Sequence, residues 1–270
     1  LVGSEMCIRD RIGSILIATI MPPGSEFTGV DRTIDAIIGC LIAMAVIALV
    51  PQAPMSEARA EVSKVMGIVS SVLDDVATGL RERNPNIIDE ALEQIRGTQT
   101  GIDDLAAAIK SGEEASRVSP FLWGTRRYIN SLARVIPPVD NAVRTSRVLA
   151  RRAHVLVEDS DTITEQQIEL LDTLSRVCLE LSEVYDVNSR VAQATVIPEC
   201  VNELRAAGQA AGMDIVPKDA VLSAYAILAQ TRSLIVDLLM VCGMSRESAL
   251  AALVPTSTTP KYEPETFDFD

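Results

Sequence analysis

The chain has 270 residues, of which 48% are hydrophobic and 3% aromatic, and its formal net charge is −13. Non-specific binding to nucleic acid depends on Lys and Arg that neutralise phosphates, so this charge argues against it. Ala, Leu and Glu are abundant and lose little conformational entropy in a helix. We therefore expect an all-α protein with no nucleic-acid partner.

Residues 1–11, LVGSEMCIRDR, do not read as the start of a folded segment. They lack the signal-peptide order of positive charge, apolar core and small-residue cleavage site. We predict that this stretch is not native to the protein and that the chain is a C-terminal fragment of a longer one.

Two apolar runs follow, at residues 12–21 and 34–50. The second has Asp35 as its one charged residue, and its seventeen residues are close to the lower limit for a helix that spans a bilayer. The first is too short to span and is interpreted as the end of a truncated membrane helix. The alternative for residues 34–50 is a buried core helix. We predict a transmembrane region over residues 12–51, in contact with the lipid bilayer.

Asp31, Arg32 and Asp35 flank the second apolar run at its N-terminal end. Charged residues in such a position either lie among the headgroups or face a transport path, and both interpretations stay open. Arg59 and Lys64 follow the run, which places that side in the cytoplasm by the positive-inside rule. The five cysteines form no CxxC pair, in keeping with a reducing compartment.

Residues 52–253 show the pattern of a cytoplasmic antiparallel helical bundle. A long helix with Ser56 as its cap is expected to end near Pro85, and a second over residues 87–111 forms a hairpin with it. Predicted core positions on the first helix recur at three- and four-residue steps: Val62, Val65, Met66, Val69, Val72, Leu73, Val76 and Leu80.

Several boundaries are predicted in the second half of the chain. Pro137-Pro138 is expected to divide or kink a helix, and Ile197-Pro198 to break or bend another. Further expectations are a capping box at Thr162 and Glu165, a short helix over residues 202–212, a central apolar helix that starts at Pro217, and a disordered acidic tail over residues 254–270.

Between residues 117 and 152 the chain has eight arginines and a single acid, Asp140. Helical spacing brings several of them to one face, which we name the basic stripe: Arg144, Arg147, Arg151 and Arg152. The stripe either contacts anionic lipid headgroups or anionic substrates, or pairs with acidic neighbours. The favoured interpretation is pairing, with partners such as Asp74, Asp75, Asp103 and Asp104.

No catalytic or cofactor motif is present. The sequence lacks GxSxG, a P-loop, GxGxxG and HExxH. The single histidine, His154, has no carboxylate or nucleophile expected beside it. We therefore predict that the protein is not an enzyme and has no cofactor and no metal site.

Residues 31–51, DRTIDAIIGCLIAMAVIALVP, resemble the last membrane helix of the fusaric acid resistance-like, or aromatic acid exporter, family. The matching positions are Arg32, Asp35, Gly39 and Pro51. The Arg-rich segment over residues 117–153 is similar to the cytoplasmic region of actinobacterial members. The resemblance implies a bacterial inner-membrane transporter-like protein that exports aromatic carboxylic acids, and it assigns no substrate-binding residue in this part of the chain.

Two other classes stay open. A membrane-anchored helical interaction or signalling protein without transport activity would show the same span and bundle. A soluble helical scaffold would bury the apolar run in its core. A homo-oligomer is expected in each case because homo-oligomers are common, and the sequence shows no interface signature.

Overall fold

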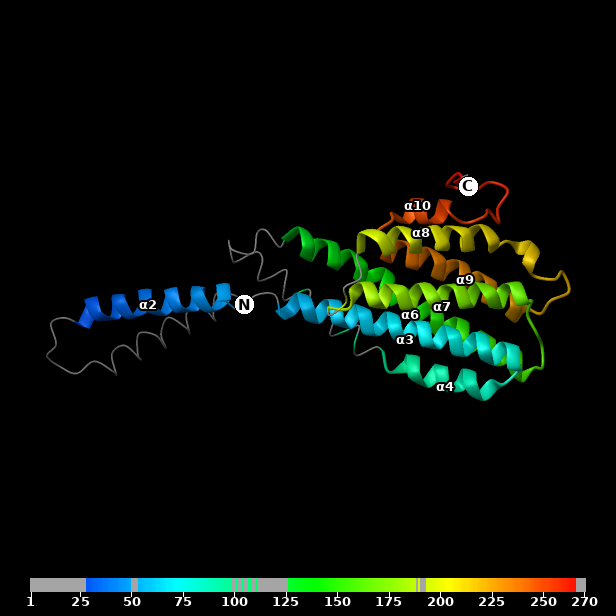
Figure 1. Cartoon of the computed structure of the whole chain (residues 1–270), viewed down its shortest axis with the longest axis horizontal. Helices are drawn as coiled ribbons and strands as arrows, with labels where there is room; N and C mark the ends of the chain where they lie inside the picture. Colours follow the sequence, from blue (N-terminus) through cyan, green and yellow to red (C-terminus); the bar gives the residue numbers. More distant parts are fainter. Residues whose placement is uncertain are drawn as a thin grey trace, which may run out of the picture. The chain divides into compact units, whose positions relative to one another are not determined.

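The computed structural model describes residues 28–49, 53–98, 126–187, 189 and 193–265, and the single residues 101, 103, 106, 107 and 110. Eight α-helices and one short 3₁₀ helix make up most of this part of the chain, and no strand occurs in it. The expected all-α fold class is confirmed. The chain divides into two compact units, residues 1–51 and 52–270, which are taken separately below (Figure 1).

The described element of the first unit is helix α2, Thr28–Leu49. It begins before Ile34, where the apolar run begins, so the predicted start was wrong. A helix does not need apolar residues in its first turns, and an acidic residue there interacts favourably with the helix dipole. The predicted segments 1–11 and 12–21 lie outside the described residues.

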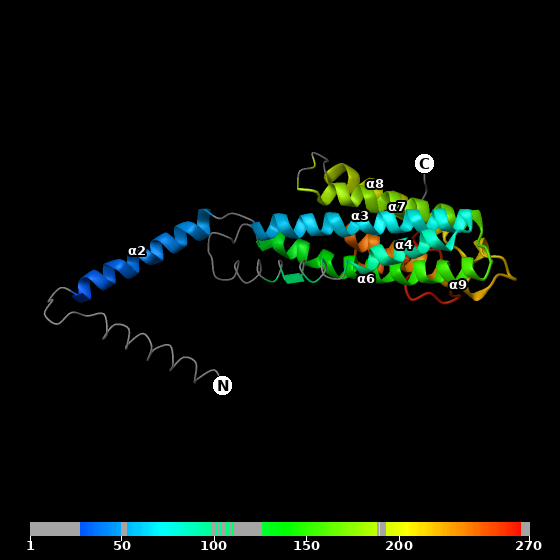
Figure 2. The ribbon, with the colours of Figure 1, turned by 90° about the horizontal axis from the view of Figure 1, so that it is seen from below.

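The second unit is a bundle of helices around a central group of four (Figures 1 and 2). The central helices are α3 (Ala53–Glu82), α6 (Arg126–Glu158), α7 (Glu165–Tyr185) and α9 (Leu222–Val241). Helix α3 packs against α7, and α6 packs against α9. The outer helices are α4 (Pro85–Arg96) on α3 and α6, α8 (Gln193–Ala210) on α7, and α10 (Arg246–Ala251) on α9, with the 3₁₀ helix η2 (Met213–Ile215) after α8.

The apolar stripe of α3 faces the core as predicted. All eight of its predicted core residues, from Val62 to Leu80, are buried. Helix α9 is long and apolar enough to cross a membrane by length and composition, yet most of it is buried inside the bundle. This is the burial expected of a central core helix, which confirms the predicted place of this segment.

Serines at seven-residue spacing join α3 to α7. Ser70 Oγ donates to the carbonyl of Ser175 at 2.8 Å, and Ser175 Oγ donates to the carbonyl of Ser70 at 2.9 Å. Seven residues away on each helix, Ser182 Oγ donates to the carbonyl of Ser63 at 2.8 Å. A Cβ added at Gly67, between them, would lie 3.3 Å from Ser182 Oγ. These small residues, which we name the serine ladder, let two antiparallel helices approach closely.

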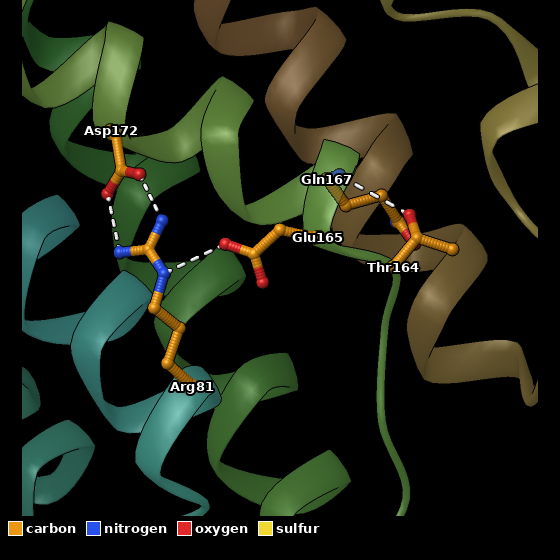
Figure 3. Close-up of polar contacts among 5 residues, drawn as sticks. All are labelled: Arg81, Thr164, Glu165, Gln167 and Asp172. Atoms are coloured by element: carbon orange, nitrogen blue, oxygen red, sulfur yellow. Dashed lines mark hydrogen bonds and ion pairs between the residues drawn. The ribbon is translucent and has the colours of Figure 1, made fainter.

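A cluster of polar side chains connects the end of α3 with the start of α7 through hydrogen bonds and ion pairs (Figure 3). Arg81 in the last turn of α3 donates to both carboxylate oxygens of Asp172 and, through Nε, to Glu165 at 3.0 Å. Beside it, Thr164 Oγ1 accepts from the backbone N–H of Gln167 at 3.4 Å and caps α7. Exposed ion pairs of this kind contribute about 1 kcal/mol or less. The cluster therefore serves mainly to fix the register of the two helix ends.

The cap of α7 is Thr164, so the capping box predicted at Thr162 was wrong. Both positions match the pattern of a hydroxyl followed three residues later by Glu or Gln. Thr164 also has a tertiary partner, because its Oγ1 donates to the carbonyl of Ile215 at 3.0 Å. Ser56 is likewise not a cap, since α3 begins at Ala53 and Ser56 lies within its first turn.

Proline ends neither α6 nor α8. Helix α6 continues through Pro137-Pro138, and α8 begins at Gln193 and continues through Pro198. The predicted division of the first helix and the predicted helix over residues 202–212 were therefore wrong. Each internal proline costs roughly 3 kcal/mol in an isolated helix. Tertiary packing outweighs this cost, because the residues around Pro138, including Val135 and Val139, are buried.

Three other boundaries differ from expectation. The helix predicted over residues 87–111 ends at Arg96 in the described part, with Gly97 as its C-cap, and most residues beyond Thr98 lie outside the description. Pro217 lies in a turn, and α9 begins five residues later. Residues 254–265, predicted to be disordered, contact the bundle: the backbone N–H of Glu265 donates to Ala251 at 2.9 Å. The last five residues lie outside the described part.

Candidate functional site

The charged cluster predicted at the start of the membrane helix lies on α2. Asp35 is exposed there. Asp31 and Arg32 lie in the first turns of the helix, and their side chains are outside the described part. A role for these three residues in transport stays a prediction.

The four arginines of the basic stripe have different surroundings in the structure. Arg144 is exposed and pairs at 2.9 Å with Asp140, four residues earlier on the same helix. Arg147 is half-buried, and its Nη2 donates to the carbonyl of Ile95 at 3.2 Å. Ile95 is in the last turn of α4, and its carbonyl also accepts from Thr98 Oγ1 at 2.7 Å beyond the end of the helix. Arg147 is therefore a structural cap of a neighbouring helix.

Pairing of the stripe with acidic side chains of neighbouring helices does not appear among the described contacts. Asp75 lies on α3 without a described arginine partner, and burial followed by the charge of Asp74 raises the pKa of Asp75. Asp104 lies outside the description. Arg151 and Arg152 are exposed. Contact with lipid headgroups or anionic substrates stays a prediction for these two.

His154 has a neighbour that the sequence analysis did not foresee. Its Nδ1 lies 3.2 Å from the carboxylate of Glu158, four residues later on α6. The expectation of no carboxylate beside the histidine was therefore wrong. The pair lies on a helical surface at the spacing of an ordinary i,i+4 contact, and no nucleophile is described beside it.

Cys178 fills apolar space in the core as predicted, whereas the Sγ of Cys200 donates to the carboxylate of Glu180 at 3.3 Å. Cys178 and Cys200 are buried, and burial raises the pKa of the Cys242 thiol to about 12. A thiol that resists ionisation is a weak nucleophile and a poor metal ligand. Within the described ranges, no three His, Cys, Asp or Glu side chains are grouped as a metal site would require.

A cavity that was not predicted lies beside α9 and α10. Its volume is about 520 Å³, and residues from α6, η2, α9, α10 and the segment after α10 line it. Most of its wall is apolar, formed among others by Tyr225, Leu228, Val236, Met240, Leu250 and Leu253. Three charged residues also line it: Arg232, Asp237 and Arg246. We name this space the α9–α10 cavity.

Asp237 is the acidic residue of the α9–α10 cavity, and its side chain is only 9% exposed. Thr145 Oγ1 of α6 donates to its Oδ2 at 3.3 Å. Burial raises the pKa of Asp237 to about 6, although Thr145, Asn141 and the positive charge of Arg246 act in the opposite direction. A carboxyl group at this position changes its charge near neutral pH.

The two arginines of the cavity lack carboxylate partners among the described contacts. Arg232 is half-buried and donates to two backbone carbonyls, those of Ala211 and, at 2.7 Å, Val254. Burial lowers the pKa of its guanidinium. Arg246, in the first turn of α10, is exposed, and its positive charge acts on Asp237 without a described ion pair.

A second hollow of about 370 Å³ adjoins the first. It shares Arg232 and Arg246 with the α9–α10 cavity and adds Lys261 and Tyr262 from the C-terminal segment. The Nζ atom of Lys261 lies 5.0 Å from the centre of the Tyr262 ring. The rim of the cavity therefore carries a third cation, on a segment that was predicted to be disordered.

One sequence signal pointed to this region. Arg232 and Asp237 interrupt an otherwise apolar helix, which is unusual for residues that end up in a core. Within the sequence they show only as charged interruptions of an apolar pattern. The cavity that both residues line is completed by η2, α10 and the C-terminal segment. Helical periodicity within α9 does not show where these elements pack.

Comparison with known proteins shows one relationship over nearly the whole chain. An uncharacterized protein of Corynebacterium glutamicum is 49% identical over 268 residues, which cover 99% of this chain and 67% of the relative. The chain belongs to the family of that protein. No protein-family profile matches the chain, and no solved structure matches it.

Membership of this family covers both units, because the aligned stretch leaves out almost none of the chain. Helix α2 and the α9–α10 cavity therefore both lie in the region that corresponds to the corynebacterial relative.

Proposed function

We propose that the chain is part of a bacterial plasma-membrane protein that exports aromatic carboxylic acids. Helix α2 lies in the bilayer, and the bundle over residues 52–253 lies in the cytoplasm. The observation that supports the membrane placement most directly is the surface of α2 over residues 34–42, where large apolar side chains are exposed.

The exposed surface of α2 has two faces. One carries large apolar residues that are 47% to 58% exposed: Ile34, Ile37, Ile38, Leu41 and Ile42. The other carries small residues at helical spacing, among them Gly39 and Ala43. Water solvates a continuous apolar face poorly, whereas lipid accepts it. Small residues suit close packing against another membrane helix.

The length of α2 fits the same environment. Its 22 residues extend over about 33 Å at 1.5 Å per residue, and the apolar run from Ile34 to Leu49 accounts for about 24 Å of this, near the lower limit for a span. Arg59 and Lys64 follow the helix and favour a cytoplasmic location for the bundle. The free cysteines of the bundle are in keeping with a reducing compartment.

The substrate class comes from the resemblance to aromatic acid exporters at Arg32, Asp35, Gly39 and Pro51. Asp31, Arg32 and Asp35 are the candidates for a transport role, because ionisable residues within a membrane helix mark substrate or ion paths. A bacterial relative supports the cellular setting.

Placement of α2 in lipid predicts protection of Cys40, which is exposed on this helix. In native membranes a membrane-impermeant maleimide should leave Cys40 unmodified, and detergent should make it reactive, as measured by peptide mass spectrometry. Ile38→Asp should make Cys40 reactive without detergent, because an Asp near the centre of a span costs about 3 kcal/mol.

Leu179→Asp is the matched control, since Leu179 is 51% exposed on α7 in the bundle. It should leave the protection of Cys40 unchanged. Equal labelling of wild-type Cys40 with and without detergent, together with release of the protein by alkaline carbonate, would show that α2 is not in the bilayer.

Export predicts a second result, in cells that lack the full-length protein. These cells should retain at least one of a panel of aromatic acids more strongly than the parent strain, and the wild-type gene should restore efflux. Asp35→Asn should restore less efflux at equal protein level in the membrane fraction. Unchanged retention of every acid, with Cys40 still protected, would instead favour a membrane-anchored interaction protein without transport activity.

A further inference from the structure

The α9–α10 cavity has positive charge that the described residues do not neutralise. Arg232 is half-buried, and its described hydrogen bonds go to carbonyl groups only. Arg246 acts on Asp237 through its positive charge, without a described ion pair. With Asp237 ionised the three charged residues of the lining sum to +1, and with Asp237 protonated they sum to +2. Removal of a guanidinium from water is unfavourable unless a partner compensates it.

Backbone carbonyls satisfy hydrogen bonds of Arg232 but not its charge. The N–H groups of a guanidinium form a planar fork that matches a carboxylate. Arg232 comes from α9, and Arg246 comes from the first turn of α10. Both residues also line the adjoining hollow at the rim, where Lys261 adds a further positive charge. The charged end of the cavity is therefore suited to an anion.

The rest of the cavity is suited to an apolar body. Leu228, Leu250 and Leu253 belong to its wall, and Tyr225 adds an aromatic ring. The volume of about 520 Å³ falls within the range of sites for small molecules, which are mostly apolar with a few placed polar groups. An inorganic anion would leave this wall unused, and a neutral apolar molecule would leave the arginines unmatched.

We propose that the α9–α10 cavity binds a small organic anion, a monocarboxylate with an apolar body. Its carboxylate is bound by Arg246 and attracted by the charge of Arg232, whose Nη groups donate to Ala211 and Val254, and its body lies against Leu228, Leu250 and Leu253. The inference concerns the bundle alone and does not rest on export or on the placement of α2. Binding at this position would bring α9, α10 and the C-terminal segment together around one ligand.

Asp237 sets the depth to which the carboxylate enters. Its side chain is turned toward α6 by the hydrogen bond from Thr145, so the anionic end of the ligand is expected at the mouth with Arg246. The apolar end then points inward. Because like charges repel, Asp237→Asn should leave the affinity for a monocarboxylate unchanged or increase it.

The test is a calorimetric titration of the full purified chain with benzoate and octanoate, with benzyl alcohol and inorganic phosphate as matched probes. At least one of the two carboxylates should bind saturably. Benzyl alcohol and phosphate should bind at least about tenfold more weakly. The alcohol lacks the anionic group that the arginines bind, and phosphate lacks the apolar body that the cavity wall contacts.

Arg246→Gln should weaken carboxylate binding by about tenfold or more. Arg246 is exposed, so this change should leave the fold intact, which circular dichroism would check. Arg144→Gln, an exposed arginine outside the cavity, is the control and should bind as the wild type does. Absence of saturable binding of both carboxylates overturns the proposal, and so does unchanged affinity in Arg246→Gln. Equal or tighter binding of phosphate or benzyl alcohol overturns the assignment to an organic anion.

Discussion

Replacement of Asp237 by Asn is expected to raise the free energy of unfolding at pH 7.5 by about 1–3 kcal/mol. The side chain is only 9% exposed, and burial raises its pKa from the ordinary value of 3.8 to about 6. An ionised carboxylate at this position therefore destabilises the folded state. Asn keeps an oxygen that accepts the hydrogen bond from Thr145 and removes the charge.

The pH dependence follows from the sign of this shift. The folded state holds the proton of Asp237 up to about pH 6, whereas the unfolded chain releases it near 3.8. Between these values the folded state binds more protons, so stability falls as pH rises through this window and stays lower above it. The amount by which the Asn variant exceeds the wild type in free energy of unfolding should therefore be largest above pH 6. It should fall to less than about 1 kcal/mol near pH 4.

Urea denaturation of both proteins at pH 4 and pH 7.5 measures the effect. Asp219→Asn is the control, because Asp219 is an exposed aspartate outside the core, and its substitution should change stability by no more than about 0.5 kcal/mol. A variant less stable than the wild type at pH 7.5 would contradict the argument. The argument would also be contradicted if the variant and the wild type differed in free energy of unfolding by the same amount at both pH values.

Substitution of Ser70 by Leu is expected to lower the free energy of unfolding by about 3 kcal/mol or more. Ser70 is 6% exposed in the serine ladder, where its hydroxyl and that of Ser175 each donate to the other's backbone carbonyl. Leucine adds bulk at the closest part of the interface between α3 and α7. The two helices would have to separate, and both would lose packing along their length.

Ser71→Leu is the matched control, because Ser71 is the next residue on α3 and is exposed. It should change the free energy of unfolding by about 0.5 kcal/mol or less. The double variant Ser70→Ala with Ser175→Ala removes both hydroxyls without adding bulk and should stay within about 1 kcal/mol of the wild type. Equal effects of Leu at positions 70 and 71 would show that the ladder does not control helix spacing.

Local sequence determined much of the architecture. Apolar residues at three- and four-residue steps predicted the inward face of α3, and all eight positions are buried. The continuous apolarity of α9 predicted its central place, and Asn84-Pro85 predicted the break between α3 and α4. These signals are local because helical periodicity and the conformations of Pro and Asn are properties of a few adjacent residues.

Tertiary packing decided what local rules left undetermined. Thr162 and Thr164 both matched the pattern of a cap, and Thr164, which caps α7, also donates to the carbonyl of Ile215, 51 residues away. The penalty for proline within α6 was local, whereas the core contacts that outweigh it come from other helices. The sequence also did not foresee that residues 254–265 would pack on the bundle, since their composition alone is that of a solvated tail.

The α9–α10 cavity shows the same limit for the candidate site. Arg232 and Asp237 were visible as charges in an apolar helix, but their partners lie far away in the sequence. Thr145 is 92 residues from Asp237, and the carbonyls bound by Arg232 are 21 and 22 residues away on opposite sides. Spacing within one helix shows which residues share a face. Only the packing of α6, α10 and the C-terminal segment around α9 leaves two guanidiniums beside an apolar wall, because burial and pairing of charges depend on contacts between elements.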